Sequence, residues 1–359
     1  MNKVFVTGFP GFIGARLLTE LLRKDETFEV VALVQPKFLG AAETSRARIC
    51  SEVPSASSRF ALVTGDITQE KLGLGEGSVR SEEITGILHL AAAYDLAISR
   101  QRGMTINVEG TQNVIAFARG CRNLLRFDYV STAYVSGDHR GSFSESDFEM
   151  GQKFKNYYEE TKYLAEEVVR KERDLPWTIY RPGIVVGDSV TGETSKYDGP
   201  YYVMKTMDAL PNHFPFPKIG RGDTEVNLVP IDFIVKAMTA LTGDRESIGR
   251  TIHLTDPTPL RVSQLETLFA EYLGKKFISY PLTPGLARYA MRIGLVRKVY
   301  TMPYQLVDYF VHNVHYESDA TAKLLAKHKI VCPKFTDYFP NLIKFFKNHK
   351  EEQLQGILI

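Results

Sequence analysis

The sequence predicts an α/β fold, in which a doubly wound parallel sheet is joined to a smaller, mostly helical C-terminal lobe. Two patterns lead to this prediction. Short β-branched or apolar runs alternate with helical patterns through the first half of the 359-residue chain, which is typical of a parallel sheet covered on both faces. From about Pro257 onward the chain is aromatic and mostly helical in pattern.

Six runs in the first half are expected to be the strands of this sheet: residues 4–7, 30–34, 61–64, 87–91, 127–131 and 178–181. Apolar residues recur on one helical face between Ile13 and Leu22, and residues 108–117 and 164–169 have the same character. These three segments are expected to be crossover helices. The polar segment 45–59 is predicted to be a surface loop.

The expected domain boundaries follow from a change in amino-acid composition after Gly187. A stretch rich in glycine, proline and aromatic residues runs from 188 to 223, before residues 226–231 and 251–254 restore short strand-like runs. We therefore expect a larger domain of residues 1–187 that is rejoined by 226–256. The smaller lobe would consist of residues 188–225 and 257–359.

Composition excludes several classes of protein. Nearly balanced charges give a formal net charge of +2, so no nucleic acid partner is expected. The three cysteines lie far apart without a Cys-x-x-Cys pair, and no metal site is expected. No apolar run approaches the roughly 20 residues of a membrane-spanning helix, so no span is expected, while peripheral membrane contact stays open. Residues 3–6 resemble a strand rather than an export signal, and a cytoplasmic protein is expected.

A glycine-rich loop follows the first expected strand and opens the first expected helix. It consists of Gly8, Phe9, Pro10, Gly11, Phe12, Ile13 and Gly14. Glycines permit a tight turn and let backbone N–H groups approach a pyrophosphate at the positive end of a helix. The order of strand, glycine loop and helix therefore predicts a Rossmann-type dinucleotide site.

The end of the second expected strand carries no acidic side chain. Such a carboxylate accepts hydrogen bonds from the ribose 2'-hydroxyl of NAD, whereas here Gln35 and Lys37 follow the strand and Arg16 is within reach. NADP(H) is therefore the favoured cofactor, and NAD(H) is the alternative. Asp66 and Ile67 follow the third strand, where the carboxylate could receive the adenine amino group and the isoleucine could pack on the ring.

The spacing Tyr-x-x-x-Lys occurs three times, at Tyr158/Lys162, Tyr201/Lys205 and Tyr272/Lys276. Residues four apart share one face of a helix, so an ammonium can lie near a phenol oxygen. Only the first pair lies on an expected crossover helix between two strands of the sheet. Context therefore selects Tyr158 and Lys162 as the pair beside the cofactor.

For Tyr158 to transfer a proton beside the cofactor, the pKa of its phenol must be lowered. Lowering it from about 10 to about 7 requires about 4 kcal/mol of preference for phenolate, and Lys162 beside a partly desolvated nicotinamide site would supply much of this. Thr132 would donate a second hydrogen bond to the oxygen on which charge develops. Asn107 either caps a crossover helix or holds a water molecule next to Lys162.

The motifs together resemble the extended short-chain dehydrogenase/reductase superfamily across nearly the whole chain. They are Gly8, Gly11, Gly14, Asp66, His89-Leu90-Ala91-Ala92, Asn107, Thr132, Tyr158, Lys162 and Arg181-Pro182-Gly183. Within it, segments 130–137, 156–162 and 181–189 resemble the fatty acyl-CoA reductase and thioester reductase branch, the male sterility NAD-binding branch. Those enzymes often carry Arg at the end of the second strand, where this chain has Gln35, and this departure leaves the cofactor choice open.

The resemblance implies that Thr132, Tyr158 and Lys162 are the catalytic trio, with Asn107 beside them. It also implies further cofactor contacts from Ala91, Ala92, Ala93, Ser131, Tyr158, Lys162, Arg181, Pro182, Gly183 and Ile184. The implied reaction is NADPH-dependent reduction of an acyl thioester, carried by CoA or an acyl-carrier protein, to an aldehyde or alcohol. A homodimer is compatible with it.

Other functions share this fold. The same site would serve a ketone or alcohol dehydrogenase, or a nucleotide-sugar epimerase or dehydratase, and a non-catalytic cofactor-binding protein is a third class. A long acyl tail would need an apolar wall in the smaller lobe. Residues that either form this wall or belong to the ordinary core are Phe214, Phe216, Tyr289, Met291, Tyr309 and Phe310.

Overall fold

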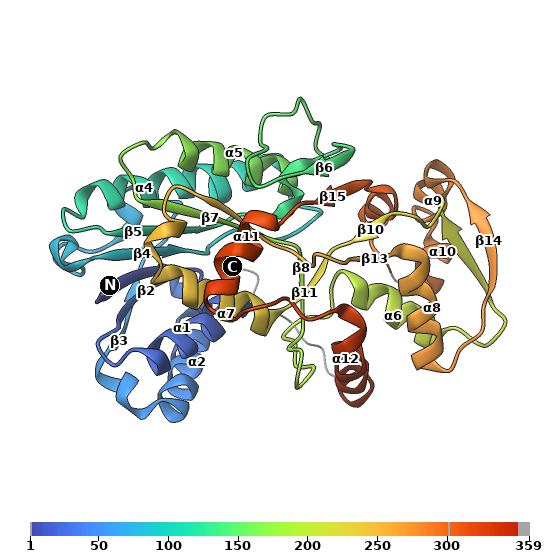
Figure 1. Cartoon of the computed structure of the whole chain (residues 1–359), viewed down its shortest axis with the longest axis horizontal. Coiled ribbons are helices and arrows are strands. Elements are labelled where there is room, and N and C mark those ends of the chain that lie inside the picture. Colours follow the sequence, from blue (N-terminus) through green and yellow to red (C-terminus); the bar gives the residue numbers. More distant parts are fainter. Residues whose placement is uncertain (1, 301, 351–359) are drawn as a thin grey trace.

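The computed structural model describes residues 2–300 and 302–350 and is built around a seven-stranded parallel sheet (Figure 1). The strands are β1 (Lys3–Thr7), β2 (Glu29–Val34), β3 (Phe60–Thr64), β4 (Gly86–His89), β5 (Arg126–Val130), β7 (Trp177–Pro182) and β12 (Thr251–Leu254). Their spatial order is β3-β2-β1-β4-β5-β7-β12, and all pairs are parallel. The chain order reverses between β1 and β4, which is where doubly wound folds bind dinucleotides. The predicted fold class and all six predicted strands are confirmed.

Helices cover both faces of the sheet, as Figure 1 shows. Alternate side chains of β1 face opposite ways, so Val4 and Val6 belong to one core cluster and Phe5 to another. One face is covered by α1 (Phe12–Lys24), α2 (Leu39–Glu52) and α7 (Ile231–Thr242), and the other by α4 (Gly110–Gly120) and α5 (Tyr157–Lys171). In α1 the leucines at 17, 18, 21 and 22 are buried on one face, which confirms the predicted amphipathic helix.

Residues 45–59, predicted to be a surface loop, are helical instead. They lie in α2 and in the 3-10 helix Pro54–Ser58 that follows it. Only Ala42 and Ile49 of α2 are buried, so the helix has almost no apolar stripe for the sequence pattern to reveal. Alanine, arginine and glutamate all favour a helix, and a few contacts with the sheet are enough to fix it.

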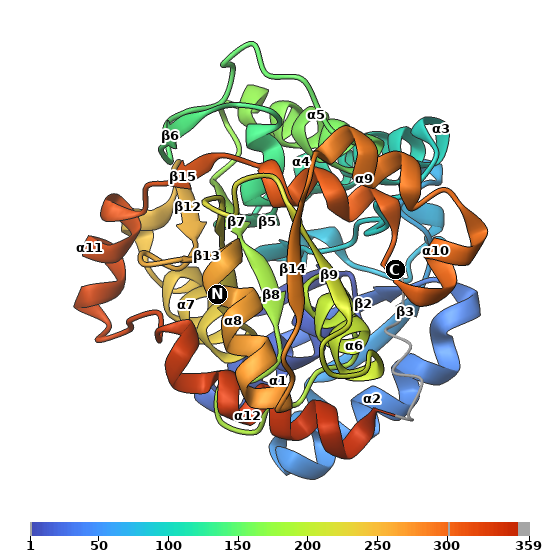
Figure 2. The same cartoon turned by 90° about the vertical axis from the view of Figure 1, so that its right-hand side faces the viewer.

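A second core lies beside the carboxyl ends of the strands (Figure 2). The elements that surround it are α6 (Pro200–Ala209), β9 (Pro215–Ile219), α8 (Val262–Leu273), β14 (Ile278–Leu282), α9 (Pro284–Ala290), α10 (Gly294–Val299), the 3-10 helix Tyr304–Val311 and α12 (Phe335–His349). Stacked rings form much of it, for example Phe269 and Phe339 with centroids 5.0 Å apart.

Three short strand pairs link this part to the sheet-containing part. One parallel pair is β8 (Ile184–Val186) with β11 (Leu228–Pro230), and the antiparallel pair is β10 (Glu225–Val226) with β13 (Leu260–Arg261). The third pair, β6 (Gly141–Phe143) with β15 (Val314–Tyr316), brings the C-terminal part of the chain back to the sheet.

The C-terminal region therefore differs from the lobe expected for residues 257–359. Helix α11 (Asp319–Lys327) buries Leu324 and Leu325 in the same core cluster as α1 and α7. A helical pattern indicates that α11 has an apolar face, but it does not tell which core this face covers. The pairing of β15 with β6 leads the chain back to the sheet, and this path places α11 beside α1 and α7.

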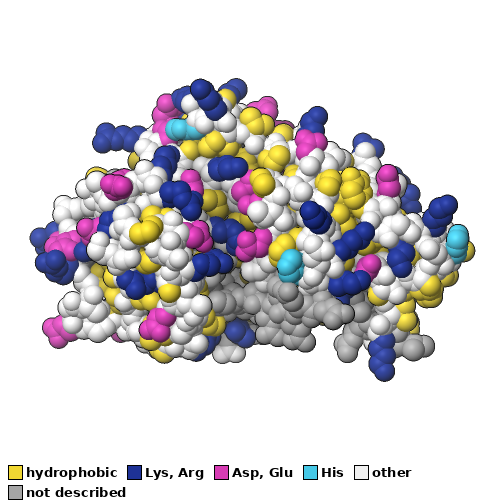
Figure 3. Space-filling model, turned by 90° about the horizontal axis from the view of Figure 1, so that it is seen from below, with side chains coloured by type: hydrophobic (Ala, Val, Ile, Leu, Met, Phe, Trp, Pro, Cys, Tyr) yellow, Lys and Arg dark blue, Asp and Glu magenta, His cyan; other side chains and the backbone are white. Residues whose placement is uncertain are grey.

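Within 2–300 and 302–350, no helix combines the length and the apolar character needed to cross a bilayer. Figure 3 shows one face of the molecule, on which charged side chains of both signs are interspersed rather than gathered into a patch of one sign.

Candidate active site

The glycine loop packs closely against neighbouring backbone and leaves the amino end of α1 without a covering side chain. Gly8 has φ +87°, and a Cβ there would lie 2.7 Å from the Ala91 nitrogen. A Cβ on Gly14 would lie 2.8 Å from the Gly8 carbonyl oxygen. Gly11 is the N-cap residue of α1, with no side chain to occupy the space in front of the first N–H groups. The loop thus has the form that a pyrophosphate requires.

Two adjoining cavities open around this loop. The larger has a volume of about 560 Å³ and the smaller about 100 Å³, and Gly8, Ala92, Tyr94 and Asp95 line both. The smaller cavity lies at the ends of β2 and β3, where an adenosine would bind, and the larger reaches the start of α5. The residues present therefore fit an extended dinucleotide that lies across the switch point of the sheet.

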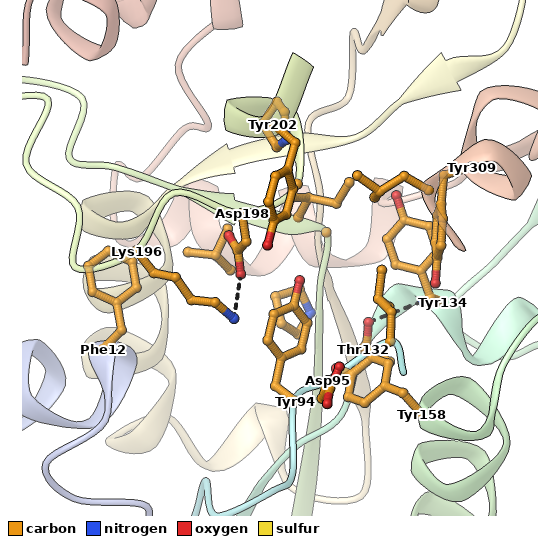
Figure 4. Close-up of a pocket in the computed structure, with 18 of the residues that line it drawn as sticks. Phe12, Tyr94, Asp95, Thr132, Tyr134, Tyr158, Lys196, Asp198, Tyr202 and Tyr309 are labelled. Carbon is orange, nitrogen blue, oxygen red and sulfur yellow. Dashed lines mark hydrogen bonds and ion pairs between the residues drawn. The ribbon is translucent and has the colours of Figure 1, made fainter. Parts of the chain in front are cut away.

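The predicted catalytic side chains line the larger cavity together. Thr132 follows β5, Tyr158 lies in the first turn of α5 and Lys162 lies one turn further on. Figure 4 shows Thr132 and Tyr158 side by side at one end of the cavity. Of the other two Tyr-x-x-x-Lys pairs, Tyr201 is buried and accepts a hydrogen bond from the Gly187 backbone, whereas Tyr272 is 38% exposed on α8.

The Tyr158 hydroxyl is a proton donor in this environment. Burial raises its pKa well above the ordinary value, and hydrogen bonding with Thr132 opposes the shift. The Tyr94 ring packs edge-on against the Tyr158 ring, with centroids 5.2 Å apart. Burial therefore keeps the phenol protonated.

Lys162 does not hydrogen-bond to Tyr158. Its ammonium donates to the Tyr129 hydroxyl and to the Val130 carbonyl oxygen, both at 2.8 Å. Burial lowers the pKa of Lys162 to about 7, and the charge of Glu166 opposes the shift. The lysine is therefore held on β5, with a charge that a nearby anionic group would stabilise.

Asn107 lies inside a helical run and not at its start. The run comprises α3 (Arg100–Gly103), a π-helical segment (Met104–Glu109) and α4, and Ser99 is the residue that caps it. The interpretation of Asn107 as a cap is therefore wrong. Its side chain accepts from the Ala93 N–H at 2.8 Å and donates to the Thr161 hydroxyl at 3.0 Å, which joins the loop after β4 to α5.

His89 belongs to the same buried network. Its ring contacts the Thr7 hydroxyl at 2.7 Å and the Thr111 hydroxyl at 3.0 Å, while Thr111 donates to the Asn107 carbonyl oxygen at 2.6 Å. Burial lowers the pKa of His89 to about 3, so the imidazole is neutral. This network supports the strand ends beneath the cofactor site.

The arginine of the Arg181-Pro182-Gly183 motif points into the core. Arg181 is fully buried, donates to Glu166 at 2.7 Å and to the Asp147 carbonyl oxygen at 3.0 Å, and lines neither cavity. Pro182, Gly183 and Ile184 do line the larger cavity. Ser131 lines it as well, although its hydroxyl donates to Glu166 at 2.6 Å.

The smaller cavity collects several predicted cofactor contacts. Those that line it are Phe9, Gln35, Lys37, Asp66, Ile67, Ala91, Ala92 and Ala93. One Asp66 oxygen already accepts hydrogen bonds from the Thr68 N–H at 2.9 Å and the Thr68 hydroxyl at 2.8 Å. Arg16 lies elsewhere: it pairs with Glu193 at 2.9 Å, packs on the Phe12 ring and lines neither cavity.

Arg102 was missed by sequence reasoning. It lies on α3, is exposed and lines the smaller cavity with Lys37. No local pattern singles it out, because it follows β4 whereas Lys37 follows β2. The fold alone brings the two cations to one cavity.

A polar rim of the larger cavity was missed as well. It consists of Tyr94 and Asp95 from the loop after β4, Lys196 and Asp198 from the loop before α6, and Tyr202 from the first turn of α6 (Figure 4). The Lys196 ammonium pairs with Asp198 at 2.9 Å and lies 4.6 Å from the centroid of the Tyr94 ring.

The predicted acyl-wall residues divide into three groups. Tyr309 and Phe310 line the larger cavity. Phe216 and Met291 are buried in the second core, and Phe214 packs against that core. Tyr289 is 67% exposed on α9 and belongs to neither cavity.

The fold and the site define the class of protein: a nicotinamide-dependent oxidoreductase of the extended short-chain dehydrogenase/reductase type. Residues 6–238 match the family described as Male sterility protein, an NAD-binding family, and the chain belongs to it.

Similar proteins agree with this assignment. Fatty acyl-CoA reductase wat of Drosophila melanogaster is 28% identical over 296 residues, which are 71% of this chain and 56% of the relative. Nonribosomal peptide synthetase asaC of Aspergillus flavus is 27% identical over 287 residues, 74% of this chain and 27% of the relative. The crystal structure of the terminal R domain from the myxalamid PKS-NRPS biosynthetic pathway has a TM-score of 0.80 at 25% identity, covering 98% of this chain and 92% of that one. The chain thus spans between about a quarter and just over half of these curated relatives.

Proposed function

We propose that this chain uses NADPH to reduce an acyl thioester to an aldehyde, with the alcohol as the product if a second hydride is transferred. One observation carries the proposal. The cavity that contains Thr132, Tyr158 and Lys162 continues into the second core, where apolar side chains form its wall.

The wall suits an acyl chain. It includes Val262, Leu265 and Phe269 of α8 and Leu306 and Phe310 of the 3-10 helix Tyr304–Val311. Each buried methylene contributes about 0.8 kcal/mol, so a chain of medium length can bind through this surface alone. A volume of about 560 Å³ lies within the range of sites for ligands of this size.

The chain's own side chains perform the proton chemistry. The nicotinamide supplies the hydride, which adds to the carbonyl carbon of the thioester. Tyr158, assisted by Thr132, gives its proton to the carbonyl oxygen, and a hemithioacetal results. The C–S bond then breaks, and the thiol leaves with the hydroxyl proton as the aldehyde forms. Lys162, held on Tyr129, stabilises the phenolate that remains.

The wall argues against a nucleotide-sugar substrate. A sugar diphosphate requires cations that face it. Among the described residues, the charged side chains that line the larger cavity are Asp95, Lys162, Lys196, Asp198 and Glu266, and none is an arginine. Lys162 is held on β5 and Lys196 is paired with Asp198. The balance of charge and apolar surface favours the acyl substrate.

Two cations favour NADPH over NADH. Lys37 and Arg102 line the smaller cavity, and Gln35 stands where an NAD-selective acidic residue would repel a 2'-phosphate. A carrier of the thioester must supply the thiol. CoA and an acyl-carrier protein both present a thiol on a long arm, and both are proposed partners.

The test is NADPH consumption with decanoyl-CoA, decanoyl-acyl-carrier protein, decanal, a ketone and a nucleotide sugar, with trapping of the aldehyde product. The proposal expects turnover with at least one thioester, with one thiol released for each NADPH consumed in aldehyde formation. Turnover of the ketone or the nucleotide sugar without any thioester activity would overturn it.

A further inference from the structure

Helix α8 places one carboxylate among apolar side chains in the wall of the larger cavity. The residues of α8 that line it are Val262, Leu265, Glu266 and Phe269, which recur with helical spacing on one face. Val262, Leu265 and Phe269 are buried apolar side chains. Glu266 is therefore the exception on a face that otherwise suits a hydrocarbon.

Glu266 lacks the hydrogen bonds that a buried carboxyl needs. Its Oε1 atom is buried and has no hydrogen-bond partner among the described residues. Burial raises the pKa of this carboxyl to about 7, and the charge of Lys218 opposes the shift only in part. Leaving a buried acceptor unsatisfied costs about 1–3 kcal/mol.

The other charged groups on this cavity have partners within the protein. Lys162 donates to Tyr129, Lys196 pairs with Asp198, and an Asp95 oxygen accepts from the Ala97 N–H at 2.8 Å. Among the charged side chains that the structure describes here, Glu266 is set apart because its side chain lines the cavity while its buried Oε1 atom accepts no hydrogen bond.

We propose that Glu266 binds a hydrogen-bond donor of the thioester substrate, a hydroxyl or an N–H group, so the cavity selects a functionalised substrate over a plain hydrocarbon chain. This inference rests on the proposed thioester substrate. The donor has two sources of the same chemistry: a substituent on the acyl chain, or an amide of the arm that carries the thiol. A site built to bind a donor discriminates strongly against analogues that lack it, because its own polar group is then left unpaired.

The test measures binding without turnover. Calorimetric Kd values are compared for S-decyl-CoA and for three S-(hydroxydecyl)-CoA ligands, which carry the hydroxyl near the sulfur, at the middle of the chain or at its far end. The corresponding methyl thioethers, which have no amide, are measured in the same way. The variants are Glu266→Leu and Glu266→Gln, with Glu271→Gln on the exposed face of α8 as the matched control.

A donor on the acyl chain would appear as at least about a tenfold loss of affinity for one hydroxydecyl ligand in Glu266→Leu, for the CoA and methyl series alike. A donor on the thiol arm would appear as an equal loss for all CoA ligands and none for the methyl thioethers. Glu266→Gln keeps an acceptor oxygen and should retain most of the affinity. Unchanged affinities for every ligand in Glu266→Leu would overturn the inference.

Failure of the proposed function looks different. In that case the wild-type protein turns over no thioester, whereas the dependence of thioether binding on Glu266 is measured independently of turnover. If thioesters are reduced and Glu266→Leu binds and reduces hydroxylated and plain chains as the wild type does, only the inference about Glu266 fails.

Discussion

The Lys162 ammonium donates a hydrogen bond to the Tyr129 hydroxyl at 2.8 Å, and not to Tyr158. A helical spacing of four residues predicted that the lysine would lie next to the phenol, yet β5 provides better acceptors at Tyr129 and Val130. The two side chains start from the same helix, α5, but the ammonium of Lys162 is anchored on β5. In the proposed reaction Lys162 would contribute charge and Tyr158 a proton.

Replacement of Tyr158 by Phe should lower kcat by about 10²- to 10⁴-fold, because the proton donor is lost. The affinity for the cofactor should stay unchanged, since the ring remains in place. Stopped-assay kinetics together with cofactor titration measure both quantities. Tyr272→Phe, which removes the exposed phenol of another Tyr-x-x-x-Lys pair, should leave kcat unaltered. Equal kcat values for Tyr158→Phe and the wild type would contradict the assignment.

Alanine at Gly8 should abolish cofactor binding. The new Cβ would lie 2.7 Å from the Ala91 nitrogen at a residue whose φ is +87°, so the loop must move. The control is Gly40→Ala in α2, where nothing lies within 4 Å of the added Cβ. It should stabilise the helix by about 0.5–1 kcal/mol and leave binding unchanged. Equilibrium titration with NADPH measures the difference, and normal binding by Gly8→Ala would refute the role of the loop.

Arg102→Ala should raise the KM for NADPH by about tenfold, which corresponds to the loss of about 1.4 kcal/mol from a charged hydrogen bond. The KM for NADH should not change, because NADH has no 2'-phosphate. Arg100 on the same helix is the matched control, since it pairs with Glu160 at 2.8 Å and does not line the cavity. An equal effect of Arg102→Ala on both cofactors would show that this residue does not select between them.

Arg181→Met should destabilise the fold rather than weaken cofactor binding directly. The change leaves Glu166 buried with part of its pairing lost, and breaking such a pair costs about 3–5 kcal/mol. Denaturant unfolding measures this loss. The exposed pair Arg119–Glu172 is the comparison, where Arg119→Met should cost at most about 1 kcal/mol. A stable Arg181→Met protein with reduced cofactor affinity would instead place this arginine in the binding site.

The stability gain of Glu266→Gln should depend on pH. The pKa of Glu266 is raised from 4.5 to about 7 in the folded protein, so the folded state binds more protons than the unfolded state between these values. Wild-type stability therefore falls as pH rises through this window, relative to the variant. The difference in unfolding free energy should grow by about 1–3 kcal/mol between pH 4.5 and 7 and then level off. A difference that is constant over this range would contradict the raised pKa.

The strands and the glycine loop were predictable because their signals are local. Short apolar runs indicate the buried strands, helical apolar patterns indicate the crossover helices, and the order of strand, glycine turn and helix is read along one short segment. The same reasoning failed for α2, which has only two buried residues. It also failed for α11, whose apolar face is clear but whose core is reached through the β15–β6 pairing.

The candidate site likewise contains residues whose place the sequence predicts and residues whose partners it does not. Thr132 and Tyr158 could be proposed from strand ends and helix position, and the structure places both on one cavity. From the sequence alone, Arg181 could equally well have contacted the cofactor. In the structure it pairs instead with Glu166, a buried carboxylate on α5. Sequence shows which groups are present, whereas pairing depends on which elements face each other.

By itself, the sequence determined the parallel sheet, the glycine loop and the place of Tyr158 and Lys162 on one crossover helix, because periodicity and spacing act within a single element or between consecutive ones. Only the tertiary structure decided that Lys162 lies on Tyr129, that Arg102 and Lys37 share a cavity, and that Glu266 lines the larger cavity with an unpaired buried oxygen. The physical reason is that desolvation and hydrogen-bond pairing are set by groups distant along the chain, which the packed fold alone brings together.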